Sequence, residues 1–316
     1  MPVQVESTVQ TEVKRSQSAA PLTPPAVSEL QLPSTLGFKT PESVLYDAAA
    51  DLYLVANVNG TPTALDNNGF ISQVNPDGSL RALSFIAGGQ NGVTLNAPKG
   101  MAIDGPVLYV ADVNSVRRFD SKTGKPLGNI SLPKATFVND ITLAPGGTAF
   151  VSDSGLEFRD GKLQPTGSDT IYRIDGDKVS IVATGKQLEQ PNGLQYADGK
   201  LLCASFASNK LRLLSITGEV LATVTLPGGT LDGIVALPDG QFVVSSWEKQ
   251  SLYVGSFAQG FTLLRSNLAA PADIGVDPDR NRLLVPLFLN DELRFVDNSY
   301  SGSTPTVSPV ALAPQL

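Results

Sequence analysis

One short phrase recurs six times along this chain, and this repetition limits the possible folds more than any other feature. From residue 41 onward, each copy joins a polar anchor, an apolar strand, a Pro/Asp/Gly turn and a second apolar strand. The first copy reads PESVLYD at residues 41–47, and its second strand reads LYLV at residues 52–55. Third and fourth strands follow, for example at residues 170–174 and 221–226. Four short strands in a period of about 40 residues are typical of a β-propeller blade.

Six copies predict an all-β fold, a six-bladed β-propeller with four-stranded antiparallel blades. We expect residues 38–316 to form this single domain and residues 1–37 to form a flexible Pro/Ser-rich leader. The last blade lacks an outer strand, so a terminal strand must close the ring. The segment 29–32 from the N-terminal side is the preferred candidate, and the segment 304–307 is the alternative.

Two repeats carry insertions between their second and third strands. Blade 1 gains residues 59–69, and blade 3 gains a segment that runs from Ser154 to Lys162 and beyond. Loops that lengthen on one face of a repeat protein often border its binding face. We therefore expect both insertions near the functional pocket.

The composition excludes several kinds of chemistry. The 316 residues include no histidine, so a Ser-His-Asp triad, a histidine-ligated zinc ion and a histidine base are all impossible. The one cysteine, Cys203, lies in an apolar run, which favours a buried structural thiol over a reactive one. Any catalysis must therefore use carboxylates, amides, lysine, hydroxyls or a metal ion held by oxygen.

Charge and hydropathy limit the partners. A net charge of −7 makes nucleic acid an unfavourable partner, because phosphate binding needs a basic surface. No run reaches the roughly 18 apolar residues of a membrane helix, so we expect no membrane span. A small-molecule substrate and a monomeric state are the expectation. A signal-peptide apolar region is missing from the chain; a periplasmic or secreted location is nevertheless the first hypothesis and a cytoplasmic location the second.

The second residue of each repeat is the strongest candidate for function. The innermost strand of every blade begins at one face of a propeller, so these six residues must converge on the axis. They are Glu42, Lys99, Asn139, Asn192, Asp232 and Ala272. Two carboxylates and two amide oxygens at one point predict a hard-cation site, with calcium as the first choice. Mg²⁺ and Mn²⁺ are alternatives, and Zn²⁺ is a weaker one because it prefers nitrogen or sulfur; simple turn residues would also fit each position alone.

The order of these anchors resembles a known family. The matching motifs are PES at 41–43, ND at 139–140, PNG at 191–193, LDG at 231–233 and ADIGVD at 272–277. The pattern is similar to the regucalcin/gluconolactonase (senescence marker protein-like) superfamily, which includes diisopropylfluorophosphatase, over about residues 38 to 300. The resemblance implies calcium bound by Glu42, Asn139, Asn192 and Asp232, and hydrolysis of lactones or related esters. The segment around Lys99 and the blade 1 insertion resemble an exported bacterial branch of the family.

Lys99 departs from the pattern, because many relatives carry a different residue at this axial position. Its ammonium group could stabilise an oxyanion or hold a carboxylate or phosphate of the substrate. It could equally turn away, pair with a carboxylate or weaken the metal site by repulsion. We retain it with Asp232 as a candidate catalytic residue.

The ends of the second strands return to the same face and should form the rim of the pocket. They carry Asn57, Asp112, Asn114, Asp153, Phe206, Trp247 and Phe288. The predicted substrate-binding set consists of these residues without Asn114, together with Asp140. Asp140 and Asp153 are also candidates to orient Asn139 or a water molecule. The three aromatic residues could instead only pack between blades.

The sequence therefore favours a metal-dependent lactonase or esterase. Asp232 would activate water as a general base or attack as a nucleophile, and the cation would polarise the carbonyl group. The alternative is a propeller that binds a small molecule or protein outside the cytoplasm without catalysis, since a fold does not fix a function. A strictosidine-synthase-like condensation is disfavoured by the missing histidine and cysteine pair.

Overall fold

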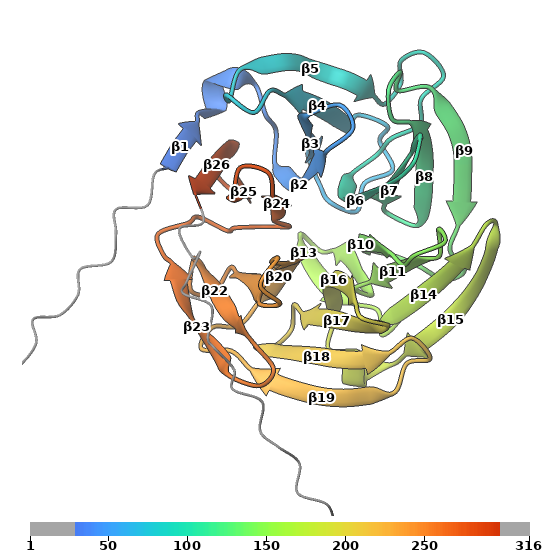
Figure 1. Ribbon diagram of the computed structural model, residues 1–316. Helices are drawn as coiled ribbons and strands as arrows, with labels where there is room; N and C mark the ends of the chain where they lie inside the picture. The colour runs from blue at the N-terminus through green and yellow to red at the C-terminus, as the bar shows by residue number, and fades with distance from the viewer. Residues whose placement is uncertain (1–28, 298–316) are drawn as a thin grey trace, which may run out of the picture.

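The six repeats fold into six four-stranded antiparallel sheets in the computed structural model, which describes residues 29–297 (Figure 1). The sheets stand around a common axis, and the first strand of each sheet lies nearest to it. The predicted all-β, six-bladed propeller is confirmed.

The blades follow the chain order. Blades 1 to 3 consist of β2 (Pro41–Asp47), β3 (Leu52–Asn57), β4 (Phe70–Val74), β5 (Leu80–Ala87), β6 (Pro98–Asp104), β7 (Val107–Asp112), β8 (Ser115–Asp120), β9 (Pro126–Ser131), β10 (Val138–Leu143), β11 (Ala149–Asp153), β14 (Thr170–Asp175) and β15 (Lys178–Thr184). Blades 4 to 6 consist of β16 (Pro191–Ala197), β17 (Lys200–Ser205), β18 (Lys210–Ser215), β19 (Val220–Thr225), β20 (Leu231–Ala236), β21 (Phe242–Ser246), β22 (Ser251–Ser256), β23 (Gly260–Arg265), β24 (Gly275–Asp277), β25 (Arg282–Leu287), β26 (Glu292–Asp297) and β1 (Glu29–Leu32).

Both insertions lie where the sequence predicts them, between the second and third strands of blades 1 and 3. The blade 3 insertion forms a separate hairpin of β12 (Leu156–Arg159) and β13 (Lys162–Pro165). The helical elements among residues 29–297 are two short 3₁₀ turns, η1 (Ser34–Leu36) and η2 (Lys186–Leu188). None of the helices in this part of the chain has the length and apolar character needed to cross a membrane.

The N-terminal segment closes the ring. Strand β1 pairs antiparallel with β26, so that Leu30 lies opposite Phe295. The Glu29 carboxylate accepts a hydrogen bond from Arg294 Nη1 at 2.7 Å and binds Arg265 of blade 5. The preferred closing strand is thus confirmed, and the propeller begins before the expected boundary at residue 38. The rest of the expected leader, residues 1–28, and the alternative strand at 304–307 lie outside the described residues.

The apolar core is divided among the spaces between neighbouring blades. One cluster joins Tyr53 and Val55 of blade 1 to Leu284 and Phe295 of blade 6, and the other interfaces repeat this arrangement. Each buried side chain of this size contributes about 1.5–3 kcal/mol to stability. Cys203 is fully buried in one such cluster, as predicted, and burial raises the pKa of its thiol to about 12.

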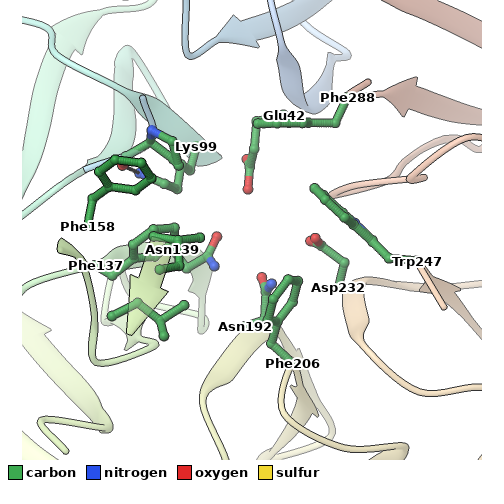
Figure 2. A pocket seen from close by; sticks show the side chains of 13 residues that line it. Glu42, Lys99, Phe137, Asn139, Phe158, Asn192, Phe206, Asp232, Trp247 and Phe288 are labelled. Atoms are coloured by element: carbon green, nitrogen blue, oxygen red, sulfur yellow. Dashed lines mark hydrogen bonds between the residues drawn. The ribbon is translucent and has the colours of Figure 1, made fainter. Parts of the chain in front are cut away.

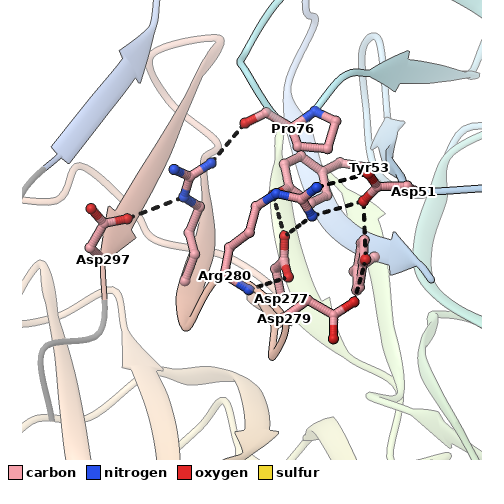
Figure 3. Close-up of polar contacts among 9 residues, drawn as sticks. Asp51, Tyr53, Pro76, Asp277, Asp279, Arg280 and Asp297 are labelled. Atoms are coloured by element: carbon pink, nitrogen blue, oxygen red, sulfur yellow. Dashed lines mark hydrogen bonds and ion pairs between the residues drawn. The ribbon is translucent and has the colours of Figure 1, made fainter. Parts of the chain in front are cut away.

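A polar network supports the closure between blades 1 and 6 (Figure 3). The buried Asp277 carboxylate accepts hydrogen bonds from Tyr53 Oη at 2.5 Å and from Arg280 Nη1 at 3.0 Å. Arg280 also forms a bidentate pair with Asp51, at 2.8 and 2.7 Å. Asp277 is fully excluded from solvent, whereas the Asp51 side chain is 54% exposed. The two carboxylates therefore hold the same guanidinium in very different surroundings.

This difference makes a testable prediction. We expect Asp277→Ala to lower the free energy of unfolding by about 2–3 kcal/mol, because it leaves the buried Tyr53 hydroxyl without its acceptor. Asp51→Asn is the control, because asparagine tolerates the left-handed backbone of this residue (φ 51°), and it should cost less than about 1 kcal/mol, as loss of an exposed ion pair does. Denaturant unfolding of both variants measures the difference. Equal losses would contradict the assignment of Asp277 as the buried centre of the closure.

Candidate functional site

A β-bulge directs each of the five polar anchors toward the axis. In blade 1, Pro41 pairs with Asn57 and Ser43 pairs with Ala56, so Glu42 is the extra residue. The register breaks at the same place in the first strands of blades 2 to 5, where Lys99, Asn139, Asn192 and Asp232 lie. A bulge interrupts the ladder and turns a side chain out of the sheet. Five bulges at equivalent positions therefore present five polar side chains to one space.

Serines of the second strands satisfy the backbone groups that two of these bulges leave free. Ser152 Oγ accepts a hydrogen bond from Asp140 N at 2.9 Å and donates to Asn192 O of the next blade at 2.6 Å. Ser245 Oγ links Gly233 N to Ala272 O in the same way, at 2.8 and 2.9 Å. Each serine thus couples a bulge to the neighbouring blade.

Two of the anchors are followed by glycine because the space beside the backbone is too small for a side chain. A Cβ atom at Gly193 would lie 2.2 Å from the backbone oxygen of Asp232, and one at Gly233 would lie 2.4 Å from the nitrogen of Ile274. The inner strands of adjacent blades approach too closely here for a side chain. The Asn-Gly and Asp-Gly pairs of the repeat therefore combine a polar side chain near the axis with a close backbone contact.

Four buried oxygens converge at the centre without hydrogen-bond partners (Figure 2). They are Glu42 Oε2, Asn139 Oδ1, Asn192 Oδ1 and Asp232 Oδ1. Among residues 29–297, eight buried side-chain nitrogen and oxygen atoms lack a partner, and these are half of them. Leaving one such atom unpaired costs about 1–3 kcal/mol. Four acceptors from four blades at one point are therefore a preformed environment for a donor or a cation.

The amide of Asn139 is oriented by its neighbours. Its Nδ2 donates to Ser154 Oγ at 3.1 Å, and Ser154 Oγ in turn donates to Pro191 O at 2.8 Å. Because the nitrogen side of the amide is held, the oxygen side faces the centre. The amide of Asn192 lies beside the Asp232 carboxylate, together with the Trp247 indole.

The floor of the site holds two acidic side chains, Glu42 and Asp232, and one basic side chain, Lys99. Burial raises the pKa of Asp232 to about 8, with a further contribution from Asp140 and opposition from Trp247 and Asn192. Burial and the charge of Asp232 also hold the pKa of Glu42 well above its usual range, although Lys99 opposes this. A bound cation would remove this penalty by compensating the two carboxylates.

The donor set fits a hard divalent cation. All four unpaired atoms are oxygens, two from carboxylates and two from amides, and calcium takes such ligands together with water. Within residues 29–297, no three histidine, cysteine, aspartate or glutamate side chains gather as a metal-binding group. The candidate site thus depends on its two asparagines. Calcium and its position remain a prediction.

Lys99 belongs to the same floor, but its ammonium group turns away from the centre (Figure 2). Nζ donates to Pro62 O at 2.9 Å and to Ala97 O at 3.0 Å, and it lies 4.6 Å from the centroid of the Phe137 ring. Burial lowers its pKa to about 8, while the charge of Glu42 opposes this shift. These contacts tie the blade 1 insertion to blade 2.

The space above the floor is a cavity of about 240 Å³ with mainly apolar walls. Phe206, Trp247 and Phe288 form one wall; Trp247 lies 5.7 Å from Phe206 and 5.3 Å from Phe288, centroid to centroid. All three predicted aromatic residues therefore do line the pocket.

The four polar residues predicted for the rim of the pocket do not line the cavity. Asn57, Asp112, Asp140 and Asp153 are buried, and none of them lines this cavity. Their side chains hold backbone: Asp112 accepts from Asn96 N and Ala97 N, for example, and Asp153 accepts from Phe137 N. Polar residues at strand ends satisfy loop amides here rather than a ligand. The prediction that they contact substrate is not supported by this geometry, whereas Asp153 and Asp140 do position the segments around the site.

Two of these side chains support the site from behind. Asp140 accepts hydrogen bonds from Ile141 N and from Leu194 N, both at 2.6 Å, which joins blade 3 to blade 4. Asn57 Oδ1 accepts from Lys39 N at 3.0 Å and so fixes the segment before β2. Asn114 is exposed beyond the end of β7 and is also absent from the lining.

Sequence reasoning missed the opposite wall. It consists of Pro62, Phe137, Leu156, Phe158 and Leu163. Most of these residues come from the two insertions or precede an anchor. The presence of the insertions was a signal for them, but an insertion does not indicate which of its side chains turn inward.

The buried carboxylates make stability depend on pH. Glu42, Asp140, Asp232 and Asp273 all have raised pKa values, chiefly through burial. Between pH 5 and 7 the unfolded chain is ionised at these groups while the fold retains protons, so stability falls as pH rises. In the presence of a chelator, we expect the melting temperature to decline across this range. Asp232→Asn should make the decline shallower; a rising melting temperature would contradict this account.

Comparisons with known proteins come from structure alone. No protein-family profile matches the chain, and no curated protein has a significant sequence match. A gluconolactonase from Xanthomonas campestris superposes with a TM-score of 0.66 at 17% identity, over 86% of this chain and 89% of that one. A putative gluconolactonase gives 0.65 at 18% identity, over 87% and 93%. A streptogramin B lyase gives 0.60 at 14% identity, over 85% and 97%.

These similarities concern the fold. At identities below 20% they establish the propeller architecture, and both gluconolactonases share it with this chain. The resemblance that the anchor motifs carry is therefore supported at the level of the fold alone.

Proposed function

We propose that this chain is a divalent-cation-dependent hydrolase of a lactone or related ester. The observation that carries the proposal is the convergence of four buried, unpaired oxygens at the floor of an apolar cavity. The shared fold with two gluconolactonases supports the same class of reaction. The unpaired atoms are all oxygens, and two belong to carboxyl groups that a cation would ionise, which favours a cation as the occupant.

Glu42, Asn139, Asn192 and Asp232 would hold the cation, and calcium suits their oxygens best. When bound, such an ion polarises a substrate carbonyl and stabilises the oxyanion that develops on it. The amide oxygens contribute ligation without charge, and the Ser154 contact keeps the oxygen of Asn139 directed inward.

Asp232 is assigned the proton transfer. Its carboxylate lies at the cavity floor and takes a proton from water as the water oxygen attacks the carbonyl carbon. The acyl C–O bond then breaks, and the leaving alkoxide takes the proton from Asp232. The products are a hydroxy acid from a lactone, or an acid and an alcohol from an ester. A carboxylate in this position can act as the general base.

Lys99 has a positioning role in this proposal. Both hydrogen bonds of its ammonium group go to backbone carbonyls, and its charge lies near Glu42 without a direct salt bridge. The catalytic role that the sequence suggested for Lys99 is not supported by these contacts.

The assignment of Asp232 predicts a large kinetic effect. We expect Asp232→Asn to reduce kcat at least about 100-fold, because general-base catalysis supplies factors of this size. The matched control, Asp239→Asn, changes an exposed turn residue of the same blade and should leave kcat unchanged. Full activity of Asp232→Asn toward a lactone would eliminate the proposed proton transfer.

If the site binds a cation, the cation should stabilise the folded protein, and this stabilisation should require Asn139 and Asn192. Calcium should raise the melting temperature of the chelator-treated protein, because it binds the fold and not the unfolded chain. Asn139→Ala and Asn192→Ala should each remove most of this shift, whereas Asn129→Ala on the exposed surface of β9 should not. Absence of any shift with calcium, magnesium or manganese would count against the site.

Analysis of the reaction product distinguishes hydrolysis from elimination. Elimination is the relevant alternative because a lyase shares this fold. Hydrolysis adds one water molecule to the substrate mass and places ¹⁸O from labelled water in the product. Ring opening without gain of water would indicate a lyase. Saturable ligand binding with no product of either kind would indicate the non-catalytic alternative.

A further inference from the structure

Two apolar walls face each other across the cavity (Figure 2). Phe206, Trp247 and Phe288 of blades 4 to 6 form the first, and their rings contact edge-on or at a tilt. Leu156, Phe158 and Leu163 of the blade 3 hairpin contribute to the second. A ligand that reaches the floor must therefore pass between two apolar surfaces.

Polar groups in this cavity lie at its floor, with one exception. The charged and amide side chains of the lining are the five anchors, and the one polar group that the described wall side chains add is the indole N–H of Trp247, which has no hydrogen-bond partner. The donors of Lys99 are directed to backbone carbonyls. The several hydroxyl groups of a sugar would therefore lose water at the walls, where the Trp247 indole can accommodate one of them, and this is unfavourable. A site of this kind discriminates against polyhydroxylated ligands.

The hairpin has the composition of a contact surface. Phe158 is 50% exposed and Leu163 is 40% exposed, although both line the cavity. They lie opposite one another in the β12–β13 pair. Large apolar side chains exposed at the edge of a pocket gain free energy when a ligand covers them.

We propose that the substrate is an uncharged lactone or ester that carries an alkyl chain or an aryl ring, and that this apolar group lies between the hairpin and the Trp247 wall. The reacting carbonyl then reaches the polar floor, and the substituent extends toward the pocket mouth. This inference rests on the proposed function for the reaction, but it concerns the walls and not the floor.

The test compares three lactones on the full chain with calcium present. They are δ-dodecalactone, which has an alkyl chain, δ-valerolactone, which has no substituent, and δ-gluconolactone, which is polyhydroxylated. We expect kcat/KM to be at least about tenfold higher for dodecalactone than for valerolactone, and lowest for gluconolactone. The highest value for gluconolactone would overturn the proposal.

Hairpin variants identify the wall. Phe158→Ser and Leu163→Ser should each reduce the dodecalactone-to-valerolactone ratio of kcat/KM by about tenfold. Ile181→Ser is the matched control, since Ile181 is 59% exposed on the outer strand β15 of the same blade and lies outside the cavity. Its ratio should not change. An unchanged ratio in both hairpin variants would overturn the role of the hairpin.

A binding measurement separates this inference from the proposed reaction. Trp247 is the single tryptophan of the chain, so its fluorescence reports directly on one wall. Asp232→Asn is titrated with dodecalactone, alone and combined with Phe158→Ser. Saturable binding of dodecalactone that weakens in the double variant would support the apolar ligand class. This conclusion would hold even if the native chain hydrolysed no lactone, a result that would refute only the hydrolase proposal. Absence of binding, despite hydrolysis of gluconolactone, would overturn the inference and leave the hydrolase proposal intact.

Discussion

The close packing of six inner strands around one axis is the constraint on which the rest of this structure depends. Neighbouring strands approach so closely that a Cβ atom at Gly193 or Gly233 would overlap the next blade. The ladder breaks at this point, and the resulting bulges direct five polar side chains inward. The same geometry therefore explains the glycines, the bulges and the convergence of the anchors.

The cost of this arrangement is concentrated at the centre. Buried carboxylates at Glu42 and Asp232 repel one another, and four oxygens have no hydrogen-bond partner. A protein retains such a cost where something else compensates it. The walls have the opposite character, since they are apolar and pack their aromatic rings against each other. A polar floor below apolar walls is the form of a small-molecule site in which the polar groups act on one end of the ligand.

The sequence predicts the fold and the floor well, because both follow from the repeat. Glu42, Asn139, Asn192 and Asp232 occupy equivalent positions, and equivalent positions in a propeller must meet at the axis. The polar rim was predicted poorly for a physical reason. Asp112 and Asp153 have the residue type of ligand-binding groups, but their carboxylates accept hydrogen bonds from loop amides of their own blades. Sequence shows the chemistry of a side chain and not its direction. The hairpin wall was missed because an insertion has no equivalent in the other repeats.

The most direct test of the central claim is a crystal structure of the chain grown with calcium, with anomalous scattering recorded. The account predicts an anomalous peak bounded by Glu42 Oε2, Asn139 Oδ1, Asn192 Oδ1 and Asp232 Oδ1, with Lys99 still directed at Pro62 O. A centre filled only by water, or by the Lys99 ammonium group, with calcium bound elsewhere or not at all, would contradict it.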